Sequence, residues 1–468
     1  MIAINGQKKQ WFIFEENREA VLESLRQGEC DGILPAACGF LDGFANFLNR
    51  ANVLPLFAQF PDHRLRRSIS PFFFCYTLLY RPLFQLPSLR AIGDTLFRSP
   101  YILRLLGFNA RQIEEGFYQG EGQKPFDVES IGEFFALAQK EDFFFYQSQW
   151  LKAIHEAWPE VFAYGLWMLD SISFSLPKGP RGLEGGRYKI CVLGIWQEGE
   201  VWPLLWCFGE GKEADLTLGK KLVARAQEIL GKGVIRYLVP DRGFIDGEWI
   251  SQLYEQGIVV IIKVRSDMDI FEQMKGLARL PETEWEEVPP PKNHQEPPPK
   301  REITGFEALE SWEGCRAPLS GCLIRDRYPE GERYQGIVIT APKAQAREIY
   351  DFWRKRWDIE EVFMAMTRYW EFDRLPACRE GVGWALIHFS LLAFTLLGIY
   401  LAYSGGEERP WSPPPLPMPE RELAVYTGPY FALLLPSELI KIILENYEAW
   451  QKNKQRLLKA LRLCEGKT

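Results

Sequence analysis

The sequence predicts an α/β protein in which a mixed-sheet core follows a mostly helical N-terminal domain. Three observations carry this prediction. Helix-length amphipathic stretches dominate residues 1–150, strand-like runs begin at residue 162, and helices and strands then alternate to about residue 265. At 468 residues the chain also exceeds what one hydrophobic core usually supports, so two or three domains are expected.

Residues 1–150 are expected to form the helical domain. Its amphipathic stretches, such as 18–26 and 87–106, are separated by Pro, Gly and Asn. The segment 105–113 could form a helix-turn-helix element, because a turn containing Gly joins two apolar-periodic runs. A plain helical hairpin is the alternative.

Three β-rich runs follow, over 162–176, 188–196 and 201–208, and the Gln-Glu-Gly-Glu segment 197–200 is typical of a hairpin turn. The first half of the core, residues 160–265, is therefore expected to begin as a meander.

Helices then alternate with strands. A helix over 217–230, ended by glycine, leads to a buried-type strand over 234–239, and a second helix and strand follow over 247–256 and 258–264. A meander followed by this alternation predicts a mixed sheet.

Residues 266–333 interrupt the alternation and are expected to form an inserted subdomain, since the Pro-rich stretch 281–301 cannot be a regular element. The core resumes over 334–405, with a strand at 336–340 and one long helix over 350–368.

The segment 384–403 is about as long as a membrane span, ~20 residues. Its polar side chains, and the lack of a second such segment, favour a buried core helix. Residues 406–468 are expected to be a Pro-rich linker, over 410–419, and a basic C-terminal helix.

Composition bounds the cellular setting. The net charge of -7 argues against a non-specific nucleic-acid coat but not against local basic surfaces, such as those at 63–67, 354–356 and 452–467. Nine cysteines without a CxxC pair fit a reducing interior, so the cytoplasm is expected. The N-terminus lacks the apolar run of a secretory signal. The four histidines are dispersed and show no zinc-ligand spacing, so no zinc site is expected.

The predicted helix 350–368 places one acid within a basic, aromatic stripe. Trp353, Arg356, Glu360 and Thr367 are spaced so that they share a helix face. A carboxylate there can hold a cation, and the neighbouring guanidinium can hold a phosphate. An ordinary surface helix with paired charges is the alternative.

Two further acids occupy positions where α/β sheets place functional groups. Asp170 lies within the first strand, and Asp241 follows a hydrophobic strand, where Gly243 lets the chain turn away. The alternatives are a hydrogen-bonded strand residue for Asp170 and a helix cap or turn residue for Asp241. Asp246 and Glu361 are nearby acids of other kinds, expected to cap a helix and to be solvated.

The three acids together resemble a known family. The strand Asp170, the Asp-Arg-Gly-Phe of 241–244 and the Arg-Trp-Asp-Ile-Glu of 356–360 resemble the DDE transposases of bacterial insertion sequences, in particular the group with a tyrosine, arginine, glutamate and lysine helix signature. The resemblance covers about residues 160–400. It implies an RNase H-like core with a β-rich insertion.

The resemblance also implies the chemistry. Asp170, Asp241 and Glu360 would be catalytic and would hold Mg²⁺ or Mn²⁺, two ions in all, for DNA cleavage and strand transfer at element ends. The helical N-terminal domain would bind those ends, a homodimer would assemble on double-stranded DNA, and no membrane would be involved. The location would be cytoplasmic, at the nucleoid.

The predicted DNA-binding residues include two departures from the family signature. Arg356 would be the signature arginine, but Trp353 stands at the tyrosine position and Thr367 at the lysine position, with Arg368 beside it. Arg242, next to Asp241, completes the set. The departures put substrate grip in doubt, so a catalytically inactive DNA-binding derivative is the alternative function.

An extruded base could stack on an aromatic side chain of the insertion, for which Trp312 and Tyr334 are candidates. The alternative is that they are core or hairpin residues.

Overall fold

The structure, a computed structural model, divides the chain into two compact units. The core unit comprises Gln147–Ser175 and Gly185–Thr367, and the terminal unit comprises Met1–Tyr146, Leu176–Glu184 and Arg368–Thr468. The described residues are 14–35, 39–116, 126–175, 187–210, 212–290, 298–370, 379–404 and 422–455. The predicted Pro-rich linker and most of the basic C-terminal stretch lie outside them.

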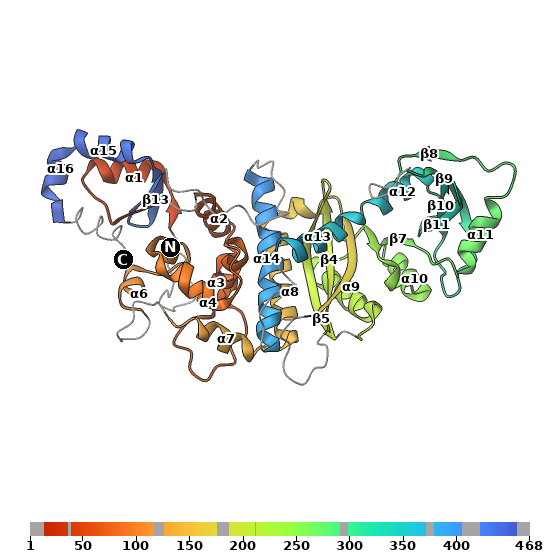
Figure 1. The fold of residues 1–468 in the computed structure, drawn as a ribbon, viewed down its shortest axis with the longest axis horizontal. Helices are drawn as coiled ribbons and strands as arrows, with labels where there is room; N and C mark the ends of the chain where they lie inside the picture. The colour runs from red at the N-terminus through yellow and green to blue at the C-terminus, as the bar shows by residue number, and fades with distance from the viewer. Residues whose placement is uncertain are drawn as a thin grey trace. The chain divides into compact units, whose positions relative to one another are not determined.

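The core unit begins with an antiparallel meander of three long strands. They are β3 (Leu166–Ser175), β4 (Arg187–Gln197) and β5 (Glu200–Glu210). Apolar side chains of β3 are fully buried, and helix α9 (Asp215–Leu230) packs on the β3, β4 and β5 part of the sheet (Figure 1). The sheet is therefore anchored by burial on this face.

Two parallel strands extend the sheet on the other side of β3. After α9, β6 (Tyr237–Pro240) pairs with β3, and after helix α10 (Gly247–Glu255), β7 (Val259–Lys263) pairs with β6, both in parallel. Asp246 caps α10 as expected, since its side chain accepts from Trp249 N at 2.8 Å. The order β5-β4-β3-β6-β7 confirms the mixed sheet that the sequence predicted and agrees with the RNase H-like core that the family resemblance implied.

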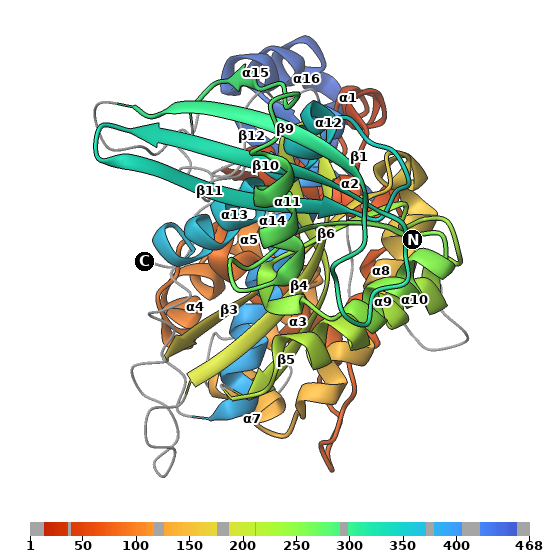
Figure 2. The same ribbon diagram turned by 90° about the vertical axis from the view of Figure 1, so that its right-hand side faces the viewer.

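The next region adds four antiparallel strands to the same sheet. After helix α11 (Asp269–Leu277) come β8 (Glu286–Val288), β9 (Lys300–Leu309), β10 (Leu319–Tyr328) and β11 (Gly331–Ile339). Strands β9, β10 and β11 run side by side in Figure 2. Because β11 pairs with β7, the sheet is continuous over nine strands, and β11 extends five residues before the predicted strand start at 336.

The prediction of one helix over 350–368 was wrong. Two helices, α12 (Ala346–Arg354) and α13 (Trp357–Arg368), meet at a tight turn in which Arg356 N donates to Trp353 O at 3.0 Å and Asp358 N to Lys355 O at 3.1 Å. These bonds span three residues instead of four and interrupt the α-helical ladder. Contacts of the side chains of Lys355 and Asp358 with β4, described below, favour the turn over helix propensity.

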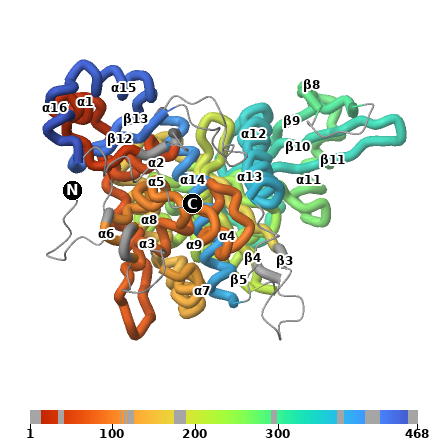
Figure 3. Tube along the Cα trace, turned by 60° about the vertical axis from the view of Figure 1, so that its left-hand side comes forward, coloured from red at the N-terminus to blue at the C-terminus, as the bar shows by residue number. Residues whose placement is uncertain are grey.

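The terminal unit brings the two ends of the described chain together. Strands β1 (Glu15–Glu16) and β2 (Gly32–Pro35) flank the hairpin of β12 (Leu423–Thr427) and β13 (Tyr430–Leu434) in the order β1-β13-β12-β2. Figure 3 shows the early helix α1 beside the late helices α15 and α16. Their bounds are α1 (Arg18–Arg26), α15 (Pro436–Glu445) and α16 (Tyr447–Lys452).

The rest of the terminal unit is helical, which confirms the expected character of the N-terminal region. The remaining helices are α2 (Gly39–Arg50), α3 (Pro71–Leu83), α4 (Leu89–Thr95), α5 (Pro100–Leu105), α6 (Ala110–Glu115), α7 (Glu129–Ala136) and α14 (Glu380–Ser404), while α8 (Lys140–Ala157) continues into the core unit; short 3₁₀ turns occupy Leu54–Ala58, Leu96–Arg98 and Pro159–Phe162. Helix α5 is buried from Tyr101 to Leu105, and α6 follows it after a turn at Gly107; whether this pair is a helix-turn-helix element or a plain helical hairpin stays a prediction.

Helix α14 is the one described helix long and apolar enough to cross a membrane, and 83% of its most apolar stretch is buried inside the protein. It packs against α3 and α7. This agrees with the buried core helix that the sequence favoured.

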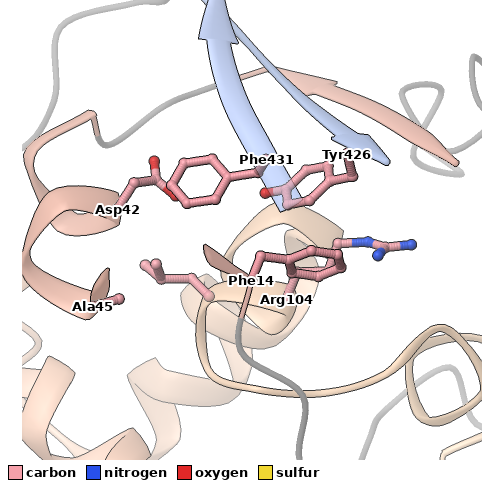
Figure 4. A pocket seen from close by; sticks show the side chains of 7 residues that line it. Phe14, Asp42, Ala45, Arg104, Tyr426 and Phe431 are labelled. Carbon is pink, nitrogen blue, oxygen red and sulfur yellow. The ribbon is translucent and has the colours of Figure 1, made fainter. Parts of the chain in front are cut away.

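A small cavity lies between the aromatic side chains of the terminal unit (Figure 4). The carboxylate of Asp42 lies beside the ring of Phe431, and the guanidinium of Arg104 lies over Phe14 and Tyr426, at 5.6 and 5.3 Å from the ring centroids. Asp42 is 5% exposed, and Tyr101 donates a hydrogen bond to it. Burial raises the pKa of Asp42 to about 7, against the lowering effect of that bond.

Candidate active site

The strand register places two of the predicted acids side by side. Leu169 of β3 is opposite Pro240 of β6, so Asp170 and Asp241, each one residue further, lie side by side, Asp170 within β3 and Asp241 just after the end of β6. Asp241 opens the short 3₁₀ turn Arg242–Phe244, but its side chain caps no helix. Asp241 is therefore a turn residue, one of the alternatives left by the sequence, and its carboxylate pairs with Arg356 instead of capping the turn.

Arg356 joins all three predicted acids. Its Nη1 lies 3.2 Å from Asp170 Oδ2 and 3.4 Å from Asp241 Oδ1, and its Nη2 contacts Glu360 Oε1 one helical turn further along. The acids come from β3, the end of β6 and α13, so the fold brings three distant carboxylates to one guanidinium.

The site carries excess negative charge that Arg356 only partly neutralises. Burial raises the pKa of Asp170 to about 7, the Arg356 guanidinium opposes the rise, and the carboxylates of Asp241 and Glu360 add to it. Asp170 is 8% exposed, whereas the side chains of the other two acids are about one-third exposed. A cation of higher charge would therefore be favoured at this place.

The turn between α12 and α13 is held by an aromatic box around Lys355. Its ammonium lies 4.2 Å from the ring centroid of Trp196 and 5.0 Å from that of Tyr164, whose hydroxyl accepts from Lys355 Nζ at 3.0 Å. The indole of Trp196 also donates to Asp358 Oδ2 at 2.7 Å. These contacts fix the residues on either side of Arg356 to β4.

The other three predicted DNA-binding residues lie on different elements of the structure. Trp353 lies on α12, away from the turn of Glu360, and its ring faces Lys263 Nζ at 5.8 Å. Arg242 is exposed beside Asp241, and Arg368 is the exposed last residue of α13. The shared helix face predicted for Trp353 and Glu360 is therefore wrong, because the turn at Arg356 divides it.

The hydroxyl of Thr367 bonds within its own helix. Its Oγ1 donates to the carbonyl oxygens of Phe363 and Met364, at 3.0 and 3.1 Å. Of the two stacking candidates, Trp312 is 6% exposed and is a core residue, while the hydroxyl of Tyr334 donates to Glu332 Oε2 at 2.5 Å on the β11 strand.

Lys263 is a charged residue near the site that the sequence interpretation missed. It ends β7 after two buried isoleucines, as Asp241 follows β6, and that shared position at a strand end was the available signal.

The donor set fits a divalent metal in chemistry and charge. Three carboxylates are hard oxygen ligands, as Mg²⁺ and Mn²⁺ prefer, and their charge exceeds that of Arg356. In the described part of the chain, no three Asp, Glu, His or Cys side chains already surround a common ion position. The guanidinium lies among the acids instead.

Comparison with known proteins gives the class of this domain. Residues 206–396, which hold most of the mixed sheet and two of the three acids, match the family described as "Transposase DDE domain". The resemblance to DDE transposases is thereby confirmed. The matched range includes Asp241, Arg356 and Glu360, and begins after Asp170. The insertion-sequence group and its helix signature stay predictions.

Among solved structures, the chain is similar to the piggyBac transposase in a cryo-EM structure of its synaptic complex with hairpin DNA. The TM-score is 0.40 at 8% sequence identity, and the alignment covers 91% of this chain and 85% of that one. No curated protein matches the sequence.

Proposed function

We propose that this protein is a DNA transposase that cleaves and joins DNA strands at the ends of an insertion sequence, with Asp170, Asp241 and Glu360 as its metal-binding acids. One observation carries the proposal. Three acids from separate elements converge on one arginine at the carboxyl edge of an RNase H-like sheet, and two of them lie within the range that matches the transposase DDE domain.

Each residue of the site has a role in this proposal. Asp170, Asp241 and Glu360 would hold Mg²⁺ or Mn²⁺, two ions in all, which when bound supply an activated oxygen nucleophile and stabilisation of the leaving oxygen. Arg356, released from the carboxylates, is within reach of a backbone phosphate and can bind two of its oxygens. The burial of Asp170 keeps water from competing for its carboxylate.

The partners follow from this chemistry. The substrates are double-stranded element ends and target DNA, with Arg242, Arg368 and Trp353 as further contacts and a homodimer that pairs two ends. The protein would act in the cytoplasm, at the nucleoid.

The direct test is metal-dependent nicking of DNA. Purified protein is incubated with Mn²⁺ and linear DNA that carries the sequences flanking its gene, and strand breaks are mapped. We expect wild type to nick at the element ends and Asp241→Ala to be inactive. Asp246→Ala is the matched control, because Asp246 is five residues away and caps α10. Absence of nicking by wild type, or equal nicking by Asp241→Ala, would overturn the proposal.

The second candidate is an inactive derivative that binds DNA. It is favoured by the tryptophan at position 353 and by Thr367, whose hydroxyl is bonded within its helix. Specific binding of the flanking sequences without cleavage in Mn²⁺ would support it.

A further inference from the structure

We propose that Lys263 is a substrate-positioning residue of this site, and that its ammonium binds a phosphate oxygen of the DNA strand beside the three acids. The inference rests on the proposed function and adds to it a residue on a different element from the predicted DNA contacts.

The strand register places Lys263 in the same row as Asp241 and Asp170. Leu238 of β6 is opposite Val260 of β7, and three residues further along each strand come Asp241 and Lys263. Asp170 is the next member of the row on β3. One row across three adjacent parallel strands, at the carboxyl ends of β6 and β7 and within β3, therefore holds two acids and one lysine.

Lys263 has no acidic partner among the described residues. Its Nζ donates to the neutral amide oxygen of Gln335 at 2.8 Å and lies 5.8 Å from the ring centroid of Trp353. The Nε2 of Gln335 lies 3.4 Å from Asp326 Oδ2, which orients the amide oxygen towards the lysine. The ammonium is thus held in place by neutral groups that leave its charge uncompensated.

Two cations, Arg242 and Arg356, lie near Lys263. Burial lowers the pKa of Lys263, and the nearby cations Arg242 and Arg356 lower it further, while Asp241 opposes them. Arg242 also forms no ion pair with described residues and is exposed. An anion placed against these cations would relieve their mutual repulsion.

A phosphate oxygen suits this position. A lysine ammonium binds phosphate as a point charge and needs no planar match, and the proposed metal-binding acids Asp241 and Asp170 lie beside it in the row. A DNA backbone that crosses the strand ends would meet both. Since Thr367 supplies no charge, Lys263 provides the ammonium from β7.

The test measures how DNA binding depends on salt. Fluorescence anisotropy of a labelled duplex carrying the flanking sequence is recorded in EDTA over a range of KCl concentrations, for wild type, Lys263→Met and Lys263→Arg. Losing one phosphate contact makes the negative slope of log K against log salt shallower by about 1. We expect this loss for Lys263→Met, with weaker binding, and a near-normal slope for Lys263→Arg.

Lys275→Met is the matched control. Lys275 also lies over an aromatic ring, that of Phe271 at 5.5 Å, but it pairs with Glu272 at 2.9 Å on α11. Its removal should leave the slope unchanged. Thermal melting of each variant shows whether the protein remains folded, and Lys263→Arg reports on charge if Lys263→Met is unstable.

The outcomes separate the two proposals. If wild type binds and nicks DNA but Lys263→Met keeps the wild-type slope, the role of Lys263 is overturned and the transposase proposal stands. An equal fall of slope in Lys275→Met would also overturn it, since the effect would then be one of general charge. If wild type binds no DNA, both proposals fail.

Discussion

Arg356 Nη1 lies 3.2 Å from Asp170 Oδ2, which links a turn between two helices to the middle of the first core strand. Asp170 is almost completely buried, and two other carboxylates contact the same guanidinium. Gathering three carboxylates around one point, one of them buried, is unfavourable unless a cation accompanies them. Arg356 therefore acts as the resident counter-charge of the site.

Removing Arg356 is expected to destabilise the protein when no metal is present. Arg356→Ala leaves Asp170 buried without its cation, and such a loss costs about 3 kcal/mol. Thermal melts should show a lower Tm in EDTA, with part of the loss recovered in Mn²⁺, because a divalent cation can replace the guanidinium.

The control for this variant is Arg354→Ala. Arg354 is exposed and lies 5.7 Å from the ring centroid of Tyr350, so its loss should change stability by less than about 1 kcal/mol. Equal effects of the two substitutions, or an Arg356→Ala loss that Mn²⁺ leaves untouched, would contradict the counter-charge role.

Metal binding can be measured without DNA. Excess Mn²⁺ should raise the Tm of wild type, since a ligand at about 100 times its Kd stabilises the folded state by about 2.7 kcal/mol. Glu360→Gln should reduce this Tm rise because it removes a charged ligand from the Arg356 face. Glu361→Gln, the next residue on α13, should keep the full response, and identical responses would exclude Glu360 as a ligand.

The box around Lys355 is expected to hold the α12–α13 turn. Trp196→Phe keeps an aromatic face but loses the 2.7 Å bond to Asp358, and a hydrogen bond to a charged group contributes about 1.5–3 kcal/mol. Urea unfolding should show a loss towards the lower end of this range, and DNA nicking should fall with it because Arg356 lies in the same turn.

The matched pair for this prediction is Lys355→Met and Lys343→Met. The side chain of Lys343 is 81% exposed, and its ion pair with Glu307 is long, at 4.0 Å, so its replacement should leave the unfolding free energy unchanged. Lys355→Met should lose about 0.5–1 kcal/mol of cation–π stabilisation. No difference between the two lysine variants would show that the box does not stabilise the turn.

The sequence predicted the parts of the fold that depend on local pattern. The meander, the alternating helices and strands, and the acids at positions 170 and 241 follow from hydrophobic periodicity and from where each strand ends. The break at Lys355 and Arg356 could not be predicted in this way, because helix propensity continues through it and the box with Trp196 comes from a strand far away in the sequence.

The position of Lys263 in the row was equally hidden. A lysine at the end of a strand is common and does not by itself indicate a site. That Lys263 lies opposite Asp241 depends on the register between β6 and β7, which the sequence does not give. Likewise, spacing predicted that Arg356 and Glu360 are neighbours, but not that Arg356 also contacts Asp170 and Asp241.

The buried Asp42 of the terminal unit is expected to make stability depend on pH. Its pKa is about 7 in the folded protein against 3.8 for the ordinary group, so the folded state binds more protons than the unfolded state between these values. Its contribution to stability is therefore fully present below about pH 4 and is lost as pH rises through about 7.

Asp42→Asn should remove this dependence while keeping an acceptor for the hydroxyl of Tyr101. Because one pKa unit corresponds to about 1.36 kcal/mol, the variant should exceed wild type in unfolding free energy by up to about 4 kcal/mol at pH 8, and the difference should vanish near pH 4. The variant keeps Glu16, whose charge contributes to the raised pKa of Asp42, so the substitution removes only the Asp42 carboxyl group. Asp94→Asn is the control, since Asp94 is 60% exposed and its one ion pair with a described residue is that with Arg98 at 3.4 Å. Urea unfolding across this pH range measures all three proteins, and parallel curves for wild type and Asp42→Asn would show that Asp42 keeps its charge when buried.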